Sequence, residues 1–387
     1  MNKRKVLFVI HQLNIGGVQK SVIPMLDAVD YEHNEVTLYI RKNRLDLLPL
    51  INSNINDIRI NEDKTKYYRK PYSAFLVVLI RILHLLKIDV SKAESCLKKY
   101  VTLKQMEYEK KHYFTNDDFD VAVSVIQGYT AAFVSDYISA KRKIMFYRDS
   151  TDSEHKLHER IMNNFDYIYC VSKGACSVLS RFYPQYANRM GVIETFVPYE
   201  EIVSKGDAFE ITNNKYIFST CGRMTSVKGF DLAVAAAEIL DKKGIDYIWY
   251  FIGDGIERHM IEKLIKEKSL QNKIELTGML ENPYPYIKSS DIYIQPSREE
   301  SFGRTIKEAL ILKRLVVSTE TVGAKEQIKN GENGILTTIT PEGLAEGIER
   351  LINDNRLSET IKNSISMIDY SDEFQNYKNV LNKVLEG

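Results

Sequence analysis

The clearest indication of the fold lies in residues 292–308, Ile292-Tyr-Ile-Gln-Pro-Ser-Arg-Glu-Glu-Ser-Phe-Gly-Arg-Thr-Ile-Lys-Glu308. The run 292–295 predicts a buried strand, and residues 304–312 predict an amphipathic helix directly after it. A strand, a polar loop and a helix in this order form the repeating unit of a parallel sheet covered by helices. The segment therefore predicts an α/β fold.

The same alternation continues from this segment toward the C-terminus and back to residue 216, and it predicts a Rossmann-like sheet. A further helix is expected at residues 370–385, after the last βα unit. The other elements expected in this half are strands at 216–221, 247–252, 274–277 and 315–318 and helices at 230–242 and 257–268.

The first half of the chain shows the same alternation and predicts a second doubly wound sheet. Residues 198–214 interrupt the pattern with polar residues, which predicts a linker. We therefore expect one domain at residues 1–200 and another at 201–369, with the terminal helix 370–387 packing back on the first. The strands expected in the first half are 6–10, 36–40, 121–125, 144–147, 168–171 and 191–194.

The composition is that of a globular protein, with 44% hydrophobic and 27% charged residues among 387. Four cysteines form no CxxC pair, so reduced thiols are expected. The apolar run 6–10 is too short for a signal peptide, and the run 72–88 contains Arg81 and His84 and is too short for a membrane span. These features predict a cytoplasmic protein.

Charge is distributed unevenly along the chain. Lys and Arg outnumber Asp and Glu by 29 to 23 through residue 200 and are outnumbered 24 to 29 afterwards. Much of the basic excess lies in residues 64–111, which suit either an interfacial helix on an anionic membrane leaflet or an ordinary core helix followed by a solvated one. Peripheral contact with the inner face of the membrane is one expectation; a nucleic-acid partner is not expected.

Glycines follow the first expected strand, in the loop from His11 to Gln19 that contains Gly16 and Gly17. Glycines let backbone N–H groups approach an anion, and a helix N-terminus adds partial positive charge. A tight turn without a ligand would use the same residues. The loop alone therefore leaves both interpretations open.

A second loop, Gly222 to Gly229, follows the strand 216–221 and contains Arg223 and Lys228. Ligands bind at the carboxyl edge of an open parallel sheet. A guanidinium and an ammonium five residues apart can bind both phosphates of a pyrophosphate without a metal. The alternative is a solvated basic loop.

The third loop places Glu300 before the helix and Glu308 inside it. The two carboxylates can accept hydrogen bonds from sugar and ribose hydroxyls, with the backbone amides of residues 302–305 at the same pocket. As an isolated pair, acidic residues near a helix N-terminus more often complement the helix dipole.

Together, Gly16-Gly17, Gly222-Arg223 with Lys228, and Glu300-Ser-Phe-Gly-(x4)-Glu308 resemble glycosyltransferase family 4 in order and spacing. The resemblance implies a GT-B fold, two Rossmann-like domains facing across a cleft, and a retaining hexosyltransferase-type enzyme that uses a UDP- or GDP-sugar. The acceptor would be lipid-linked or a polysaccharide in bacterial cell-surface glycan synthesis. No cofactor and no metal are expected, because Arg223 and Lys228 would neutralise the leaving diphosphate.

The resemblance also implies roles for single residues. Glu300, Arg223 and Lys228 would be catalytic, with Glu300 on the transferred sugar and the two cations on the diphosphate. Glu308 would bind the ribose and Gly17 the diphosphate. The donor-binding set implied in full is Gly16, Gly17, Arg223, Lys228, Met279, Leu280, Glu300, Phe302, Gly303, Arg304, Thr305 and Glu308.

One departure from the family concerns the acceptor side. Many relatives carry a histidine after the strand that here ends at Phe146-Tyr147, whereas this chain has Arg148-Asp149. Arg148 and Asp149 are therefore acceptor-side candidates.

Other readings of the sequence lead to different functions. Asp118-Phe119-Asp120 spells a metal-binding DxD, but it precedes a strand instead of following one, so we reject a metal site there. A nucleotide-sugar epimerase of the same fold and a non-catalytic nucleotide-sugar-binding partner of another transferase remain the alternatives.

Overall fold

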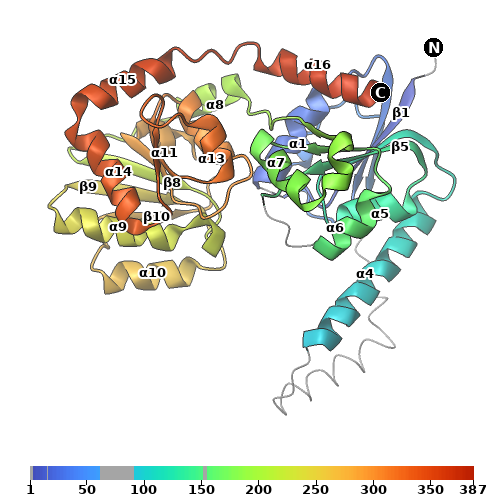
Figure 1. Cartoon of the computed structure of the whole chain (residues 1–387), viewed down its shortest axis with the longest axis horizontal. Coiled ribbons are helices and arrows are strands. Elements are labelled where there is room, and N and C mark those ends of the chain that lie inside the picture. The colour runs from blue at the N-terminus through green and yellow to red at the C-terminus, as the bar shows by residue number, and fades with distance from the viewer. Residues whose placement is uncertain (1–2, 15, 62–90, 151–154) are drawn as a thin grey trace.

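Two parallel sheets, one in each half of the chain, form the framework of the protein (Figure 1). The computed structural model describes residues 3–14, 16–61, 91–150 and 155–387. Both sheets are parallel throughout and are covered by helices, as the sequence predicts. The α/β prediction with two Rossmann-like domains is therefore confirmed.

The N-terminal sheet has seven strands in the order β3-β2-β1-β4-β5-β6-β7. Strand β1 (Arg4–Ile10) lies inside this sheet, and its residues 6–9 have no exposed surface. Burial on both faces explains the continuous apolar runs in the sequence. The strands are β1 (Arg4–Ile10), β2 (Asn34–Ile40), β3 (Asp57–Ile60), β4 (Phe119–Ser124), β5 (Ala140–Tyr147), β6 (Tyr167–Cys170) and β7 (Met190–Val192).

The C-terminal sheet has six strands in the order β10-β9-β8-β11-β12-β13. Trp249, Phe251 and Tyr293 are fully buried between this sheet and its helices. The strands are β8 (Tyr216–Cys221), β9 (Tyr247–Ile252), β10 (Ile274–Gly278), β11 (Ile292–Gln295), β12 (Leu315–Thr319) and β13 (Ile335–Thr337).

Helices cover both faces of each sheet (Figure 1). Those of the first half are α1 (Gly17–Asp27), α4 (Ser91–Tyr113), α5 (Tyr129–Tyr137), α6 (His155–Met162) and α7 (Lys173–Phe182). Those that follow are α8 (Tyr199–Gly206), α9 (Phe230–Lys242), α10 (Arg258–Glu267), α11 (Tyr284–Ser289), α12 (Arg304–Ile311), α13 (Val322–Gln327), α14 (Pro341–Asn353), α15 (Asn355–Ser366) and α16 (Glu373–Glu386).

The strand order reverses once in each sheet, between β1 and β4 and between β8 and β11. Ligands of open α/β sheets bind outside the carboxyl ends of the strands at such switch points. The Gly16-Gly17 loop follows β1, the Arg223 loop follows β8, and the Glu300 loop follows β11. All three predicted loops thus lie at a switch point.

The segment expected to be a linker contains a helix. α8 packs on α11 and α12 of the C-terminal domain, with Ile202 fully buried in that domain's core. Its boundaries follow ordinary rules, since Pro198 precedes it and Glu200 and Glu201 occupy its first turn. The polar composition of residues 198–214 hid this helix because only one side of it is buried.

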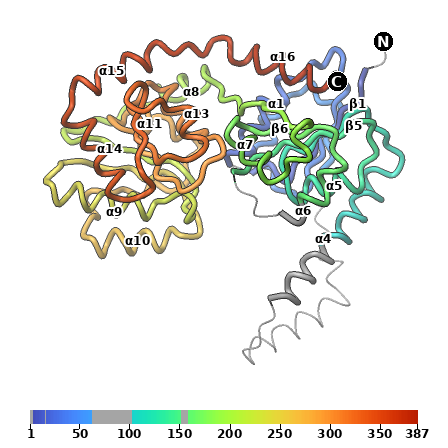
Figure 2. Tube along the Cα trace, in the orientation of Figure 1, coloured from blue at the N-terminus to red at the C-terminus, as the bar shows by residue number. Residues whose placement is uncertain are grey.

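The terminal helix α16 follows α15 of the C-terminal domain and runs along the N-terminal domain (Figure 2). Leu381 and Leu385 are buried in the core formed by β1, β2 and α1. Asn382 Nδ2 donates to the Ala28 carbonyl, and Asn382 Oδ1 accepts from the Asp30 N–H, both at 2.8 Å. The end of the chain is therefore part of the first domain's packing.

Aromatic rings stack where the chain crosses between the domains. Phe196, just before α8, lies with its ring centroid 5.1 Å from that of Phe374 and 5.7 Å from that of Tyr377 in α16. Tyr199 lies 5.7 Å from Tyr370. The two segments in which the chain crosses between the domains, residues 196–199 and 370–377, therefore lie side by side.

The basic apolar run at residues 72–88 lies outside the described residues. Of the wider segment 64–111, the structure describes α4, whose beginning projects away from the sheet (Figure 1). Among the described parts of the chain, none of the helices has the length and apolar character that a membrane span requires.

Candidate active site

Lys228 and Glu300 form the centre of the candidate site. The Lys228 Nζ atom lies 2.6 Å from Glu300 Oε1, and the side chain of Glu300 is only 9% exposed. Lys228 ends a short 3-10 helix (Ser226–Lys228) after β8, whereas Glu300 lies on the loop after β11. Because β8 and β11 are neighbours, their loops meet at the sheet edge.

The Glu300 carboxylate is fixed by two further donors. Gln295 Nε2 and Ser297 Oγ each donate to Glu300 Oε1 at 2.9 Å. Gln295 is in turn held through its Oε1 atom, which accepts from the Tyr293 and Thr305 hydroxyls at 2.5 and 2.8 Å. The carboxylate is thus preorganised by a buried network that runs from the strand to the loop.

Gly229 brings the Lys228 loop close to the Glu300 loop. Its φ is +65°, and a Cβ atom at this position would overlap the Pro296 carbonyl oxygen. Only glycine adopts this conformation and this approach without strain. Arg298 of the Glu300 loop forms a second link to the Lys228 side, through bidentate hydrogen bonds of 2.8 and 2.6 Å to Asp231. This pairing lowers the pKa of Asp231.

Arg223 is the exposed cation of the site. It follows β8, and a methyl group placed on Gly16 of the opposite domain would lie 3.7 Å from its Nη2 atom. Its guanidinium forms no hydrogen bond or ion pair with the part of the chain that the structure describes. Arg223 is therefore available to an anion in the space between the domains.

Glu308 lies deeper, in α12, and its side chain is 6% exposed. Arg304 Nε donates to Glu308 Oε1 at 2.8 Å, and the Tyr284 hydroxyl lies 3.5 Å from the same oxygen. Burial lowers the pKa of Arg304, but Glu308 and Tyr284 outweigh it and raise the pKa overall. The buried Arg304 Nη1 atom has no partner among the described residues.

The N-terminus of α12 also faces this site. Gly303 caps the helix with φ +80°, and the N–H groups of Gly303, Arg304 and Thr305 donate to no backbone or side-chain acceptor in the described chain. Unpaired amides at a helix N-terminus bind anions. Together with Arg223 and Lys228 they make the carboxyl edge of the C-terminal sheet strongly attractive to a diphosphate.

Met279 and Leu280, implied as donor-binding residues, follow β10 on the far side of β9 from this centre. Met279 is 62% exposed, whereas Leu280 packs against the C-terminal core. The structure therefore brings them to the same sheet edge, two strands away from Lys228. Phe302 also packs against the core, through its side chain.

Gly16 and Gly17 lie opposite, at the start of α1. A Cβ atom on Gly17 would have no neighbour within 4 Å, so this backbone borders open space. Lys20, one turn further along α1, places its Nζ atom 5.9 Å from the centre of the Tyr284 ring. The sequence interpretation missed Lys20, although its position one turn after the glycine pair is a usable signal.

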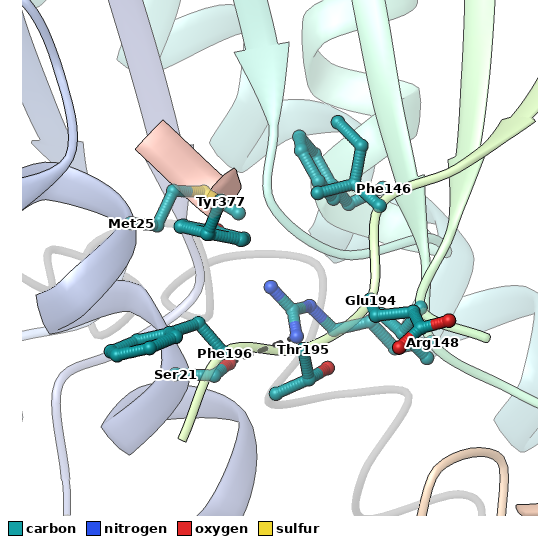
Figure 3. A pocket seen from close by; sticks show the side chains of 10 residues that line it. Ser21, Met25, Phe146, Arg148, Glu194, Thr195, Phe196 and Tyr377 are labelled. Carbon is teal, nitrogen blue, oxygen red and sulfur yellow. Dashed lines mark hydrogen bonds between the residues drawn. The ribbon is translucent and has the colours of Figure 1, made fainter. Parts of the chain in front are cut away.

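Arg148, an acceptor-side candidate, has its guanidinium inside the N-terminal domain (Figure 3). The guanidinium donates to the Val125 carbonyl at 2.7 Å and to the Ser21 hydroxyl at 2.9 Å. Burial lowers its pKa to about 10. The Arg148 carbonyl contacts the other domain, where it accepts from Ser301 Oγ at 2.9 Å.

The remaining residues of that pocket come from several elements, namely Met25, Phe146, Val171, Ile193, Glu194, Thr195, Phe196 and Tyr377. Asp149 comes directly after Arg148. The Arg148 guanidinium, which is bonded to Val125 and Ser21, is therefore directed away from Glu300.

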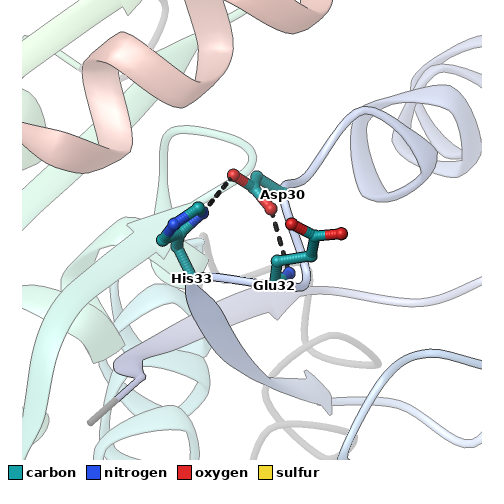
Figure 4. A group of neighbouring side chains, drawn as sticks. All are labelled: Asp30, Glu32 and His33. Atoms are coloured by element: carbon teal, nitrogen blue, oxygen red, sulfur yellow. Dashed lines mark hydrogen bonds and ion pairs between the residues drawn. The ribbon is translucent and has the colours of Figure 1, made fainter. Parts of the chain in front are cut away.

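One group of metal-ligand side chains occurs in the described part of the chain, formed by Asp30, Glu32 and His33 (Figure 4). His33 Nδ1 lies 2.6 Å from Asp30 Oδ2, and Glu32 and His33 are exposed. It lies in the turn between α1 and β2, at the opposite end of the sheet from the glycine pair. In the rejected DxD motif, Asp120 pairs with Lys141 at 2.7 Å.

Comparison with known proteins agrees with this geometry. Residues 205–366 match the family model for glycosyl transferases group 1. The chain is 32% identical over 142 residues to Alpha-D-kanosaminyltransferase of Streptomyces kanamyceticus, covering 36% of each chain. It is 28% identical over 196 residues to the lipopolysaccharide core biosynthesis glycosyltransferase LpsE of Rhizobium meliloti, covering 50% of this chain and 56% of LpsE. The chain thus spans between about a third and just over half of these curated relatives.

The likeness extends over the whole chain at the level of the fold. HepE of Anabaena, solved in complex with UDP-glucose, superposes with a TM-score of 0.71 over 99% of both chains, at 16% sequence identity. The two domains therefore have the GT-B fold of glycosyltransferases. Within that class, the C-terminal domain is related in sequence to the group 1 glycosyl transferases.

Proposed function

We propose that this chain is a retaining, metal-independent glycosyltransferase of family 4 that moves a sugar from a UDP- or GDP-sugar to a lipid-linked or polysaccharide acceptor. The observation that carries the proposal is the Lys228–Glu300 pair, with the exposed Arg223 in the same loop as Lys228, at the switch point of the C-terminal sheet. LpsE, whose name places it in lipopolysaccharide core biosynthesis, supports this acceptor class. The proposed setting is bacterial cell-surface glycan synthesis.

The donor would lie along the carboxyl edge of the C-terminal sheet. The diphosphate would contact Arg223, Lys228 and the free amides of α12, and the ribose would contact Glu308. The base would contact the backbone near Met279 and Leu280. The complex of HepE with UDP-glucose supports a uridine nucleotide as the first donor to test.

In the reaction, the bond between the anomeric carbon and the diphosphate oxygen breaks, and the acceptor hydroxyl attacks from the same face. The leaving diphosphate keeps the bond electrons, and its developing charge is stabilised by Lys228 and Arg223. The hydroxyl proton passes to the departing phosphate oxygen. Glu300, held by Gln295 and Ser297, would orient the sugar hydroxyls.

The Lys228–Glu300 contact has a chemical consequence for this scheme. The carboxylate oxygen Oε1 is occupied by three donors, so Glu300 suits a role in hydrogen bonding better than a role as a covalent nucleophile. Binding of the donor would require Lys228 to share its three N–H groups between Glu300 and the phosphate.

A panel of nucleotide sugars tests the proposal. We expect release of a nucleoside diphosphate that depends on acceptor and continues in EDTA, and a product whose anomer matches the donor by NMR. An inverted anomer, or an absolute metal requirement, would contradict the mechanism. Conversion of a nucleotide sugar without any acceptor would indicate an epimerase instead.

We further propose that the protein acts in the cytoplasm, in peripheral contact with the inner face of the membrane through residues 64–111. The basic excess of this segment supports contact with anionic lipid, at about 1 kcal/mol for each lysine or arginine near the surface. Flotation with vesicles containing an anionic phospholipid, compared with vesicles of phosphatidylcholine alone, tests it. Equal flotation with both would contradict the proposal.

A further inference from the structure

The N-terminus of α7 is completed by residues of the other domain. Ser172 caps the helix, because its Oγ atom accepts from the Ala175 N–H at 3.0 Å. The N–H groups of Lys173 and Gly174, in the first turn, have no acceptor within the helix. Both donate to the carboxylate of Glu326 in α13, Lys173 at 3.0 Å. A carboxylate is the preferred partner of a helix N-terminus.

A second contact joins the same two domains beside the first. The Ser172 hydroxyl, while accepting from its own helix, donates to the Ser301 carbonyl of the Glu300 loop at 2.5 Å. The Ser301 hydroxyl donates to the Arg148 carbonyl at 2.9 Å, at the end of β5. The residue directly after Glu300 is therefore held by the N-terminal domain through both its carbonyl and its side chain.

α13 connects these two contacts within the C-terminal domain. While Glu326 meets α7, the Gly323 N–H donates to the Glu300 carbonyl at 2.8 Å. Gln327 Nε2 donates to the Phe302 carbonyl and, at 3.2 Å, to the Gly303 carbonyl. One short helix thus touches the opposite domain on one side and the backbone of the Glu300 loop on the other.

The closeness of this interface depends on Gly174. A Cβ atom there would overlap Val322 Cγ1 and would lie 2.7 Å from Glu326 Oε1. The backbone of Gly174 is not in the left-handed region, so its own helix would accept alanine without strain. The glycine is required only when α7 and α13 are together.

We infer that α13, with Glu326 as its contact to the N-terminus of α7, positions the Glu300 loop for catalysis when the two domains close. The inference rests on the proposed transferase function and adds Ser172, Gly174, Ser301 and Glu326 to it as positioning residues. None of them belongs to the donor-binding set that the sequence implies. They act on Glu300 through the backbone of the loop.

This arrangement separates donor binding from turnover. The residues proposed to bind the diphosphate, Arg223, Lys228 and the α12 amides, belong to the C-terminal domain and do not require the α7 contact. The orientation of the sugar by Glu300 does require it. Loss of the contact should therefore lower kcat and leave the affinity for the nucleoside diphosphate unchanged, because a small displacement of a positioned group is costly only in the transition state.

Gly174→Ala and Glu326→Ala test the inference in the full-length protein. We expect kcat to fall about 10-fold or more in each variant, while the affinity for UDP and GDP stays within about twofold of the parent. Ser177→Ala, on the exposed face of α7, and Glu346→Ala, an exposed carboxylate of α14, are matched controls that should keep parental kcat. Unchanged kcat in Gly174→Ala, or an affinity loss equal to the kcat loss, would overturn the inference.

Hydrogen–deuterium exchange gives a readout that needs no turnover. Exchange at residues 172–176 and in the Glu300 loop should be slower in the parent than in Glu326→Ala, with or without UDP or GDP. If the parent transfers no sugar but shows this protection, the proposed reaction fails and the coupling stands. If the protection is the same in both proteins, the coupling is wrong.

Discussion

The Lys228 ammonium lies 2.6 Å from the Glu300 carboxylate although 72 residues separate them in the chain. The contact exists because the loops after two neighbouring strands, β8 and β11, end at the same sheet edge. In the absence of a bound anion, each group partly neutralises the other. The pair therefore keeps two groups of opposite charge ready at the point where a sugar diphosphate is proposed to bind.

Replacing either partner should abolish turnover without unfolding the protein. We expect Lys228→Ala and Glu300→Gln each to lower kcat/KM by about 100-fold or more, because each removes a group that acts on the reacting bond or its leaving group. The melting temperature of Glu300→Gln should change little, since Gln295 and Ser297 still hold position 300, whereas Lys228→Ala leaves a buried carboxylate without its cation and should lower the melting temperature. Lys263→Ala and Glu267→Gln are the matched controls, because each removes one partner of an exposed ion pair in α10. Near-parental rates would refute the site.

Gly17→Ala tests the side of the proposed site that the N-terminal domain forms. No atom lies within 4 Å of the position of the added methyl group, so the ligand-free protein should keep or slightly raise its melting temperature. If Gly17 lies against the diphosphate, the methyl group occupies the ligand's space. The thermal shift produced by UDP or GDP should then shrink by several degrees. A shift equal to that of the parent would remove Gly17 from the site.

Arg304 and Glu308 should behave as a coupled pair. Arg304→Met leaves a buried carboxylate without its cation and should lower the free energy of unfolding by about 3 kcal/mol. The double variant Arg304→Met/Glu308→Gln removes that charge and should be more stable than Arg304→Met alone. Urea unfolding of Arg304→Met, Glu308→Gln, the double variant and the parent measures the coupling. Additive losses would show that the two side chains are independent.

His11 should make stability depend on pH. Burial, and next the charges of Lys42, Arg41 and Arg44, lower its pKa from 6.5 to about 4. Between these values the unfolded chain binds more protons than the folded one, so stability falls as the pH decreases from 6.5 toward 4. At pH 5 the loss is about 1–2 kcal/mol once solvent screening is allowed for.

His11→Gln cannot take up this proton. Urea unfolding at pH 7 and pH 5 should therefore show a smaller loss of stability in His11→Gln than in the parent. His259→Gln, at a side chain that is 97% exposed, serves as the control and should follow the parent. Parallel pH profiles for His11→Gln and the parent would contradict the assigned burial.

The fold was predictable because both sheets are buried on both faces. Continuous apolar runs located all but two of the thirteen strands that the described chain contains, and helix α9 has the predicted bounds. The two missed strands are β3, which carries Asp57 and Arg59, and the three-residue β13. Both lie at sheet edges, where partial burial leaves no apolar run to recognise.

The placement of the candidate site residues was predictable where they follow strands within a spaced motif. Lys228, Glu300 and Glu308 belong to this group. The hydrogen-bond network behind Glu300 and the contact of Glu326 with α7 were not predictable from the sequence, because they depend on where distant loops meet in space. Arg148 illustrates the limit in the other direction: its position after β5 suggested the acceptor side, but its guanidinium is bonded to Val125 and Ser21 inside the domain.

The paired crossings between the domains restrict how the protein can move. A single connection would leave the two domains free to rotate in any direction, whereas here Phe196 is stacked on Tyr377 and Tyr199 on Tyr370. Two connecting segments that pack against each other form one hinge with a single axis. The domains then open by rotation about this hinge axis. Each closure brings α7 back to the same contact with α13.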